Sequence, residues 1–301
     1  MKVLITGATG LVGKAIVAQC KTNGISVHYL STSKEKIEST ENYQGFYWNP
    51  AKQEIDVACF NGVDAIINLA GSPISKSWTK AYKQTILNSR LESLQLLKST
   101  IKNENIEIKQ LISASAIGIY PDSIINYYEE KTTAISLGFL GEVAESWEKA
   151  ADEFSDLGVI VTKIRIGLVM DSNEGALPQM VKPIKLGLGA AFGSGLQWQS
   201  WIHKKDLARI FVHTLEHKLE GVFNGVAPNP VTNLELTKAI AKTVNKPLWL
   251  PNIPRFVMKL VLGEMHVLLF ESQRVCAKKI IDSGFEYRFV NLKPALEDLL
   301  E

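Results

Sequence analysis

The first thirteen residues constrain the fold more than any other stretch of the chain. The apolar run "KVLIT" at 2–6 predicts a short buried strand, and "TGATGLVG" at 6–13 leads from it into a helical pattern. In this context Gly7 permits a tight turn, Gly10 lets backbone approach a diphosphate, and Gly13 lets the helix pack on the strand. The helix N-terminus offers free N–H groups and partial positive charge. The opening therefore predicts a dinucleotide-binding α/β fold.

Strand and helix patterns alternate along the chain that follows. Further strands are predicted at 25–30, 62–71, 109–116 and 158–167, and helices at about 10–23, 78–104 and 138–157. Continuous apolar runs such as 62–71 are typical of strands covered on both faces. Because strands that alternate with helices form crossover units, we expect a Rossmann-type, doubly wound parallel sheet.

The sequence changes in character after about residue 168. Residues 174–198 are rich in Gly and Pro with little period, so we expect a long loop-like segment, which at that length usually carries function. A helix is expected at 206–217, a capping box at Thr232 and Glu235, and a mostly helical tail from about 245. We expect a dinucleotide-binding domain at 1–167, with 202–226 returning to it, and a smaller substrate or cap domain at 168–201 and 227–301.

Charge and cysteine content exclude several classes of protein. The net charge is +2, from 33 basic and 31 acidic residues, and gives no reason to expect a nucleic-acid or membrane partner. Cys20, Cys59 and Cys276 lie far apart and form neither a metal spacing nor a disulfide framework. With no signal peptide pattern and no apolar run long enough to span a bilayer, we expect a cytoplasmic protein. The sequence leaves open whether the protein forms a homodimer.

The end of the second predicted strand bears on which dinucleotide is bound. NAD binding usually needs an acid there for the ribose 2′-OH, and "LSTSKEK" at 30–36 has none before Glu35. The positions in between carry donors suited to a 2′-phosphate: Ser31, Thr32, Ser33 and Lys34. This favours NADP, with NAD as the alternative, because Thr32 and Glu35 also fit a capping box and Lys34 also fits a solvated surface.

Several motifs resemble a known family. The glycine-rich opening, "NLAG" (68–71) and "SASAIGIY" (113–120) resemble an extended short-chain dehydrogenase/reductase. "GSGLQWQSWIH" (193–203), "NGVAPNPVTN" (224–233) and "LGEMHVLLFESQRV" (262–275) resemble an atypical subgroup, the NAD-dependent epimerase/dehydratase-like proteins with a C-terminal domain of unknown function. The resemblance runs from residue 1 to 301. It implies a Rossmann-type domain followed by a small, mostly helical C-terminal domain, in proteins named as nucleoside-sugar epimerases or cell-division inhibitors.

The resemblance also implies cofactor contacts, position by position. On the diphosphate side they are Gly7, Thr9, Gly10, Leu11, Val12 and Gly13. At the adenosine ribose they are Ser31, Thr32 and Ser33, along the nucleotide Asn68, Leu69 and Ala70, and near the nicotinamide Ser113, Ala114 and Ser115. The subgroup often carries arginine where this chain has Thr32, and that departure weakens the NADP prediction. Arg90 and Arg165 could clamp an anionic substrate or a cofactor phosphate, or form ordinary ion pairs.

The usual catalytic pair is not where the family spacing places it. Ser115 fits the catalytic serine, and the spacing then puts tyrosine near 139 or 140 and lysine four residues later. The chain has Phe139 and Leu140, then Val143 and Ala144, and Phe139 and Val143 fit an apolar core face. Tyr127 and Lys131 have the Tyr-x-x-x-Lys spacing, but they lie too early and among turn-forming residues, so we expect a loop coincidence.

Other groups leave alternatives open. Ser115 fits a hydrogen bond to a substrate carbonyl or a structural role; Glu142 and Glu145 fit a cleft or a solvated face. His203 fits an acid/base or a packing role, Asp206 a helix N-terminal charge, and Trp198 and Trp201 a pocket or the core. We expect either an NADP(H)-dependent oxidoreductase or epimerase on a small carbonyl or sugar nucleotide, or a catalytically inactive nucleotide sensor or scaffold linked to cell division.

Overall fold

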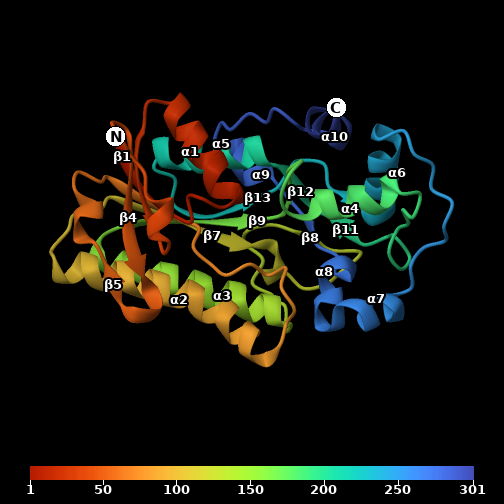
Figure 1. The fold of residues 1–301 in the computed structure, drawn as a ribbon, viewed down its shortest axis with the longest axis horizontal. Coiled ribbons are helices and arrows are strands. Elements are labelled where there is room, and N and C mark those ends of the chain that lie inside the picture. The colour runs from red at the N-terminus through yellow and green to blue at the C-terminus, as the bar shows by residue number, and fades with distance from the viewer.

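A computed structural model describes all residues, 1–301, and is built on one large sheet (Figure 1). Its strands are β1 (Lys2–Thr6), β2 (Ser26–Ser31), β3 (Ser39–Thr40), β4 (Tyr43–Asn49), β5 (Glu54–Ile55), β6 (Ala65–Asn68), β7 (Gln110–Ala116), β9 (Ile160–Ile166) and β13 (Gly221–Gly225). They run in the order β13-β9-β7-β6-β1-β2-β4-β3, and β5 pairs with β4. All pairs are parallel except those of β3 and β5 with β4. Because the strand order reverses at β1, the sheet is doubly wound, which confirms the predicted Rossmann-type fold.

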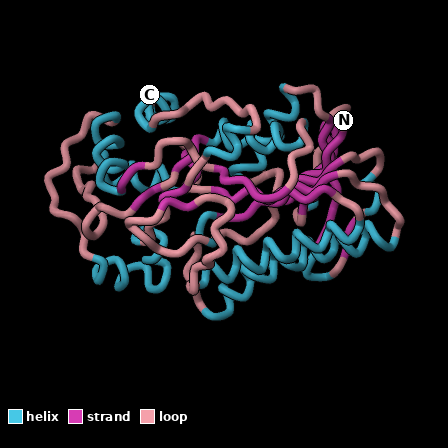
Figure 2. The backbone as a smooth tube through the Cα atoms, turned by 180° about the vertical axis from the view of Figure 1, so that it is seen from behind, coloured by secondary structure: helices cyan, strands magenta, loops and turns pink.

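Helices cover both faces of the sheet (Figures 1 and 2). On one face α1 (Leu11–Thr22) packs beside α5 (Lys204–Glu216), and on the other α2 (Lys80–Asn103) packs beside α3 (Phe139–Asp152). The central strands are therefore buried along their whole length. Ile66 and Ile67 on β6, for example, are both fully buried. This is why their sequences are continuous apolar runs rather than alternating ones.

The C-terminal region is mostly helical, as predicted. Its helices are α4 (Ala176–Lys185), α6 (Asn233–Thr243), α7 (Arg255–Leu262), α8 (Val267–Phe270), α9 (Lys278–Asp282) and α10 (Leu292–Leu300). Short strand pairs join it to the rest: β8 (Tyr127–Tyr128) with β15 (Arg274–Val275), β10 (Leu168–Met170) with β12 (Trp201–His203), and β11 (Trp198–Gln199) with β14 (Val231–Thr232). No helix is both long and apolar enough to span a membrane.

The expectation of a loop-like segment at 174–198 is wrong for its first half, which contains α4. Leu177, Val181 and Ile184 stand four and three residues apart on one buried face of this helix. Pro183 lies inside the helix near its end, and glycines follow the helix. Only three apolar positions mark the helical period, so the pattern could not be recognised among these residues. The capping box is confirmed: the Thr232 hydroxyl accepts from the Glu235 N–H, and the Glu235 carboxylate accepts from the Thr232 N–H at 2.7 Å.

Candidate functional site

The turn between β1 and α1 requires glycine at two positions. Gly7 has a φ of +71°, and a Cβ there would lie 3.0 Å from the Leu69 carbonyl oxygen. A Cβ on Gly13 would lie 2.2 Å from the Gly7 carbonyl oxygen, well inside van der Waals contact. The helix can therefore begin this close to the strand only without those side chains.

This turn also presents unused donors. The amides of Leu11, Val12 and Gly13, in the first turn of α1, have no protein acceptor. Gly10 is the N-cap and offers no side-chain cap, and the first turn carries no acid. Free amides at the positive end of a helix dipole form a binding site for the oxygens of a diphosphate. The residues of this turn, which also includes Thr9, therefore fit the diphosphate of a dinucleotide.

The end of β6 is fastened to this turn through one hydroxyl group. Thr6 Oγ1 donates to Asn68 Oδ1 at 2.8 Å and accepts from the amides of Leu69 and Ala70, each at 3.0 Å. The Asn68 amide in turn donates to Ser113 Oγ at 3.2 Å. Asn68 and Ser113 thus join three neighbouring strands, while the backbone of Leu69 and Ala70 is held along the edge where a nucleotide would pass.

The end of β2 carries no acid, as the sequence indicated. The Ser31 hydroxyl donates to the Ser33 carbonyl at 2.9 Å and accepts from the Ser33 N–H at 3.1 Å, so it stabilises its own loop. Thr32 is exposed, and the Lys34 ammonium lies 5.0 Å from the centre of the Tyr47 ring. Thr32 and Lys34 remain as donors for an anionic group at this end of the sheet.

Arg90, on α2, is a largely buried cation beside the loop that follows β6. One guanidinium nitrogen donates to the carbonyls of Ile86 at 2.8 Å and Ser72 at 3.3 Å, and the group lies 4.8 Å from the Trp147 ring centre. No carboxylate pairs with it, and its Nε has no acceptor. Burial lowers the pKa of Arg90 to about 10, so it is still charged at neutral pH. An anionic group would be a suitable partner for such a charge.

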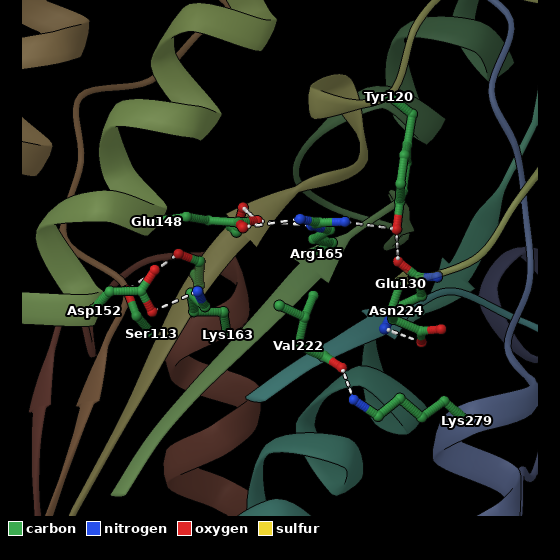
Figure 3. Close-up of polar contacts among 12 residues, drawn as sticks. Ser113, Tyr120, Glu130, Glu148, Asp152, Lys163, Arg165, Val222, Asn224 and Lys279 are labelled. Atoms are coloured by element: carbon green, nitrogen blue, oxygen red, sulfur yellow. Dashed lines mark hydrogen bonds and ion pairs between the residues drawn. The ribbon is translucent and has the colours of Figure 1, made fainter. Parts of the chain in front are cut away.

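Ser115 and Arg165 both bind the buried carboxylate of Glu148, and Figure 3 shows the pair of Glu148 and Arg165. Ser115 Oγ donates to Glu148 Oε1 at 2.7 Å, and Arg165 grips the same carboxylate through Nε at 2.7 Å and Nη2 at 2.9 Å. Arg165 Nη1 donates to the Tyr120 hydroxyl at 2.9 Å, which donates to Asn224 at 2.8 Å. The structure therefore places Arg165 in a bidentate ion pair, the alternative to a free anion clamp. Ala114, between Ser113 and Ser115, is buried in the core.

Tyr127 and Lys131 do not share a helix face. Tyr127 is in β8, and Lys131 lies in the following turn with its side chain 85% exposed and paired to Glu129. Partial burial, with hydrogen bonding to Cys276, raises the pKa of Tyr127 to about 12, away from the range of a proton shuttle. The geometry agrees with a coincidence of spacing, although Tyr127 lies in a short strand and not in the expected loop.

The start of α3 is apolar where the family spacing would place tyrosine and lysine. Phe139 meets Trp78 edge-on at 5.1 Å between ring centres, and Val143 is buried against Trp78 and Ile86. Leu140 packs against Gly118, where a Cβ would lie 3.2 Å from its own. The predicted core role of Phe139 and Val143 is confirmed.

The acidic residues of α3 nearest to this end face solvent. Glu142 is exposed, and Glu145 forms an ion pair with Lys149 at 2.6 Å, four residues later. The solvated-face interpretation holds for this pair.

His203 and Asp206 have structural partners. His203 Nδ1 accepts from the Lys205 N–H at 3.1 Å and so caps α5, and its ring stacks on Phe289 at 4.0 Å. Asp206 is fully buried and accepts from the backbone N–H groups of Arg288 and Phe289, which ties the C-terminal segment to α5. The packing interpretation therefore fits His203, and Asp206 does more than supply a helix charge.

Burial lowers the pKa of His203 to about 4, although Asp298 nearby acts in the opposite direction. Because the folded protein then binds a proton less readily than the unfolded chain, this histidine stabilises the fold fully above pH 6.5. We expect stability to fall as the pH drops from about 6.5 toward about 4, with a limiting slope of about 1.4 kcal/mol per pH unit. Urea unfolding across this range should show that slope, and His203→Asn, which keeps a cap acceptor, should reduce it; an unchanged slope would assign it to other groups.

The two tryptophans of "QWQSW" differ. Trp201 is fully buried and donates to the Asn229 carbonyl at 2.9 Å, as a core residue does. Trp198 is half-buried, donates to the Ile124 carbonyl at 3.1 Å, and lies 4.4 Å from the guanidinium of Arg274. Sequence reasoning missed Arg274, Glu148 and Tyr120, because the role of each depends on a contact with a residue that is distant in sequence.

Comparison with known proteins assigns the family. A family model described as the NAD dependent epimerase/dehydratase family matches residues 3–138, and a domain of unknown function matches residues 253–299. An epimerase family protein of Staphylococcus aureus (strain N315) is 35% identical over 301 residues, which cover 99% of this chain and 98% of the relative. The chain belongs to this epimerase family. The resemblance found in its motifs is therefore confirmed.

Solved structures of similar proteins support the same assignment. The human epimerase family protein SDR39U1 (isoform 2), solved with NADPH, superposes on this epimerase family protein with a TM-score of 0.86 at 29% identity, covering 99% of each chain. A nucleoside-diphosphate sugar epimerase from Corynebacterium glutamicum gives a TM-score of 0.79 at 28% identity, covering 100% of this chain and 58% of that chain.

Proposed function

We propose that this epimerase family protein binds NADP(H) at the β1–α1 turn and acts as an oxidoreductase or epimerase on a small carbonyl compound or sugar nucleotide. The observation that carries the proposal is the set of three free amides at Leu11, Val12 and Gly13, facing an edge where the β6 loop is already fixed. The NADPH in the human relative and the epimerase name of the Corynebacterium protein support it.

The end of β2 supports NADP(H) over NAD(H) in this proposal. A ribose 2′-OH finds no acid there, whereas Thr32 and Lys34 can donate to a 2′-phosphate. Arg90 supplies a further positive charge beside the β6 loop, and binding an anionic cofactor there would compensate it. A cytoplasmic location belongs to the same proposal, since all three cysteines are free and buried.

When bound, the cofactor supplies hydride transfer; the chain's own residues bind, orient and exclude water. The amides of α1 hold the diphosphate. The apolar side chains of Phe139 and Val143 exclude water from the start of α3. Ser115 Oγ donates its proton to Glu148 and is buried, so it could only accept a hydrogen bond, from a substrate hydroxyl that enters at the end of β7. In this proposal Ser115 orients the substrate, and a group outside a Tyr–Lys pair handles the proton.

The second candidate is a catalytically inactive nucleotide sensor or scaffold. The observation that favours it is the apolar cluster of Trp78, Phe139 and Val143, where a proton-transferring pair would stand. The two candidates are separated by turnover of NADPH with a panel of carbonyl and sugar-nucleotide substrates. Turnover that Ser115→Ala removes supports the enzyme, whereas tight binding without any turnover supports the sensor.

Titration of the purified protein with NADPH and NADH, followed by nucleotide fluorescence, tests the cofactor. We expect NADPH to bind about tenfold or more tightly than NADH, because one charge-assisted hydrogen bond contributes on the order of 1.5–3 kcal/mol. Lys34→Ala should weaken NADPH several-fold and leave NADH unchanged. The control Lys238→Ala removes an exposed lysine of α6 and should change neither. If neither dinucleotide binds, the proposed function is wrong.

A further inference from the structure

The junction of β8, β11 and β15 holds a guanidinium group that the proposed function does not use. Arg274 Cζ lies 4.4 Å from the centre of the Trp198 ring and 5.1 Å from that of Tyr127. The parallel pairing of β15 with β8 sets Arg274 opposite Tyr127, and the hydrogen bond from Trp198 to the Ile124 carbonyl fixes the second ring. Two cation–π contacts therefore hold this side chain in one place.

The charge of Arg274 has no counterpart in the protein. No carboxylate lies within 4.0 Å of it, and its Nε is buried without an acceptor. Arg165, by contrast, has both oxygens of Glu148 as partners. A buried N–H without a partner is costly, and a planar guanidinium fork matches the paired oxygens of a phosphate or carboxylate.

The segments that carry this group are fixed to each other independently of it. Ser272 Oγ donates to the Ser123 carbonyl at 2.9 Å and accepts from the Trp198 N–H at 3.0 Å. The Ser272 N–H donates to Asp122 Oδ1 at 2.8 Å. Chain from the loop after β7, from β11 and from the C-terminal region thus converges on one rigid point, as a ligand site requires.

We propose that Arg274, with the rings of Trp198 and Tyr127 beside it, recognises the oxyanion of a small molecule, a phosphate or a carboxylate. The proposal rests on the proposed function only in taking this molecule to be the substrate. Arg274 holds the anion through its terminal N–H groups, and Tyr127, which is 47% exposed, offers apolar surface at the same place. The substrate is then an anionic compound rather than a neutral carbonyl.

Isothermal titration of the full-length protein with pyrophosphate, UDP and glucuronate, each with and without NADPH, tests this site. We expect wild type to bind at least one probe, and Arg274→Met to weaken that binding roughly tenfold or more while NADPH affinity stays the same. Arg274→Lys, which keeps the charge and loses the planar fork, should lie in between. Binding of pyrophosphate and UDP but not glucuronate assigns a phosphate; the reverse assigns a carboxylate.

The matched control is Arg288→Met, because Arg288 is an exposed arginine outside this junction and its loss changes the net charge equally. It should leave probe binding unchanged. Equal probe affinity in wild type and both Arg274 variants, an equal loss in Arg288→Met, or no binding of any probe at millimolar concentration would overturn the proposal. Since NADPH is measured separately, loss of the anion site and failure of cofactor binding remain distinguishable. Should Arg274→Met not fold, Arg274→Lys carries the test.

Discussion

Gly13→Ala removes dinucleotide binding and lowers the free energy of unfolding by roughly 3 kcal/mol. The new Cβ would meet the Gly7 carbonyl oxygen at 2.2 Å and the Ala8 Cα at 2.7 Å, both backbone atoms that cannot rotate away. The first turn of α1 must therefore shift away from β1, and the amides that face the diphosphate shift with it. Urea unfolding and NADPH titration measure the two effects, and we expect at least about a hundredfold loss of affinity.

Gly10→Ala separates binding from folding at the same turn. Its φ is −82°, and a Cβ there would meet only the Gly7 carbonyl oxygen, at 3.4 Å, an ordinary contact. We expect stability to change by about 1 kcal/mol or less, as for an N-cap exchange, and NADPH affinity to fall at least about tenfold because the Cβ stands where the diphosphate approaches. Unchanged affinity in both glycine variants would show that the turn is not the binding site.

Glu148→Ala is expected to destabilise the fold by about 3–5 kcal/mol, because it leaves the guanidinium of Arg165 buried without a charge partner. Both side chains of this pair are only 8% exposed, so water cannot replace the lost carboxylate. The same change removes the acceptor of the Ser115 hydroxyl. Urea unfolding measures the loss.

A double-mutant cycle shows whether the effect belongs to the pair. Glu148→Met combined with Arg165→Met should cost less than the sum of the single changes, because no charge is left buried alone. Lys149→Ala breaks the exposed pair with Glu145 on the same helix and should change stability by no more than about 0.5 kcal/mol. A cost for Glu148→Ala as small as that of Lys149→Ala would contradict the buried-pair argument.

The parts of this molecule that could be predicted are those fixed by neighbours in sequence. The strand, glycine turn and helix at the N-terminus form one local unit, and the apolar runs of the parallel strands report their burial directly. Helix α4 could not be recognised, because it has only ten residues, contains Pro183 near its end and is followed directly by glycines.

The candidate site was only partly predictable for a related reason. The roles of Arg165 and Ser115 are decided by Glu148, which reaches them from α3 across 17 and 33 residues of chain. A sequence identifies an arginine but not whether a carboxylate neutralises it. Arg90 and Arg274 have no such partner, and that fact emerges only when every neighbouring element is in place.

The hydroxyl of Thr6 has a consequence for how a nucleotide would associate. Because it holds Asn68 together with the amides of Leu69 and Ala70, hydrogen bonds within the protein itself fix this part of the nucleotide site. The loop is therefore ordered when the protein folds, and little further conformational entropy is lost when the nucleotide binds. A cofactor arriving at such a preorganised cradle should be captured at a rate set by encounter rather than by rearrangement of the protein.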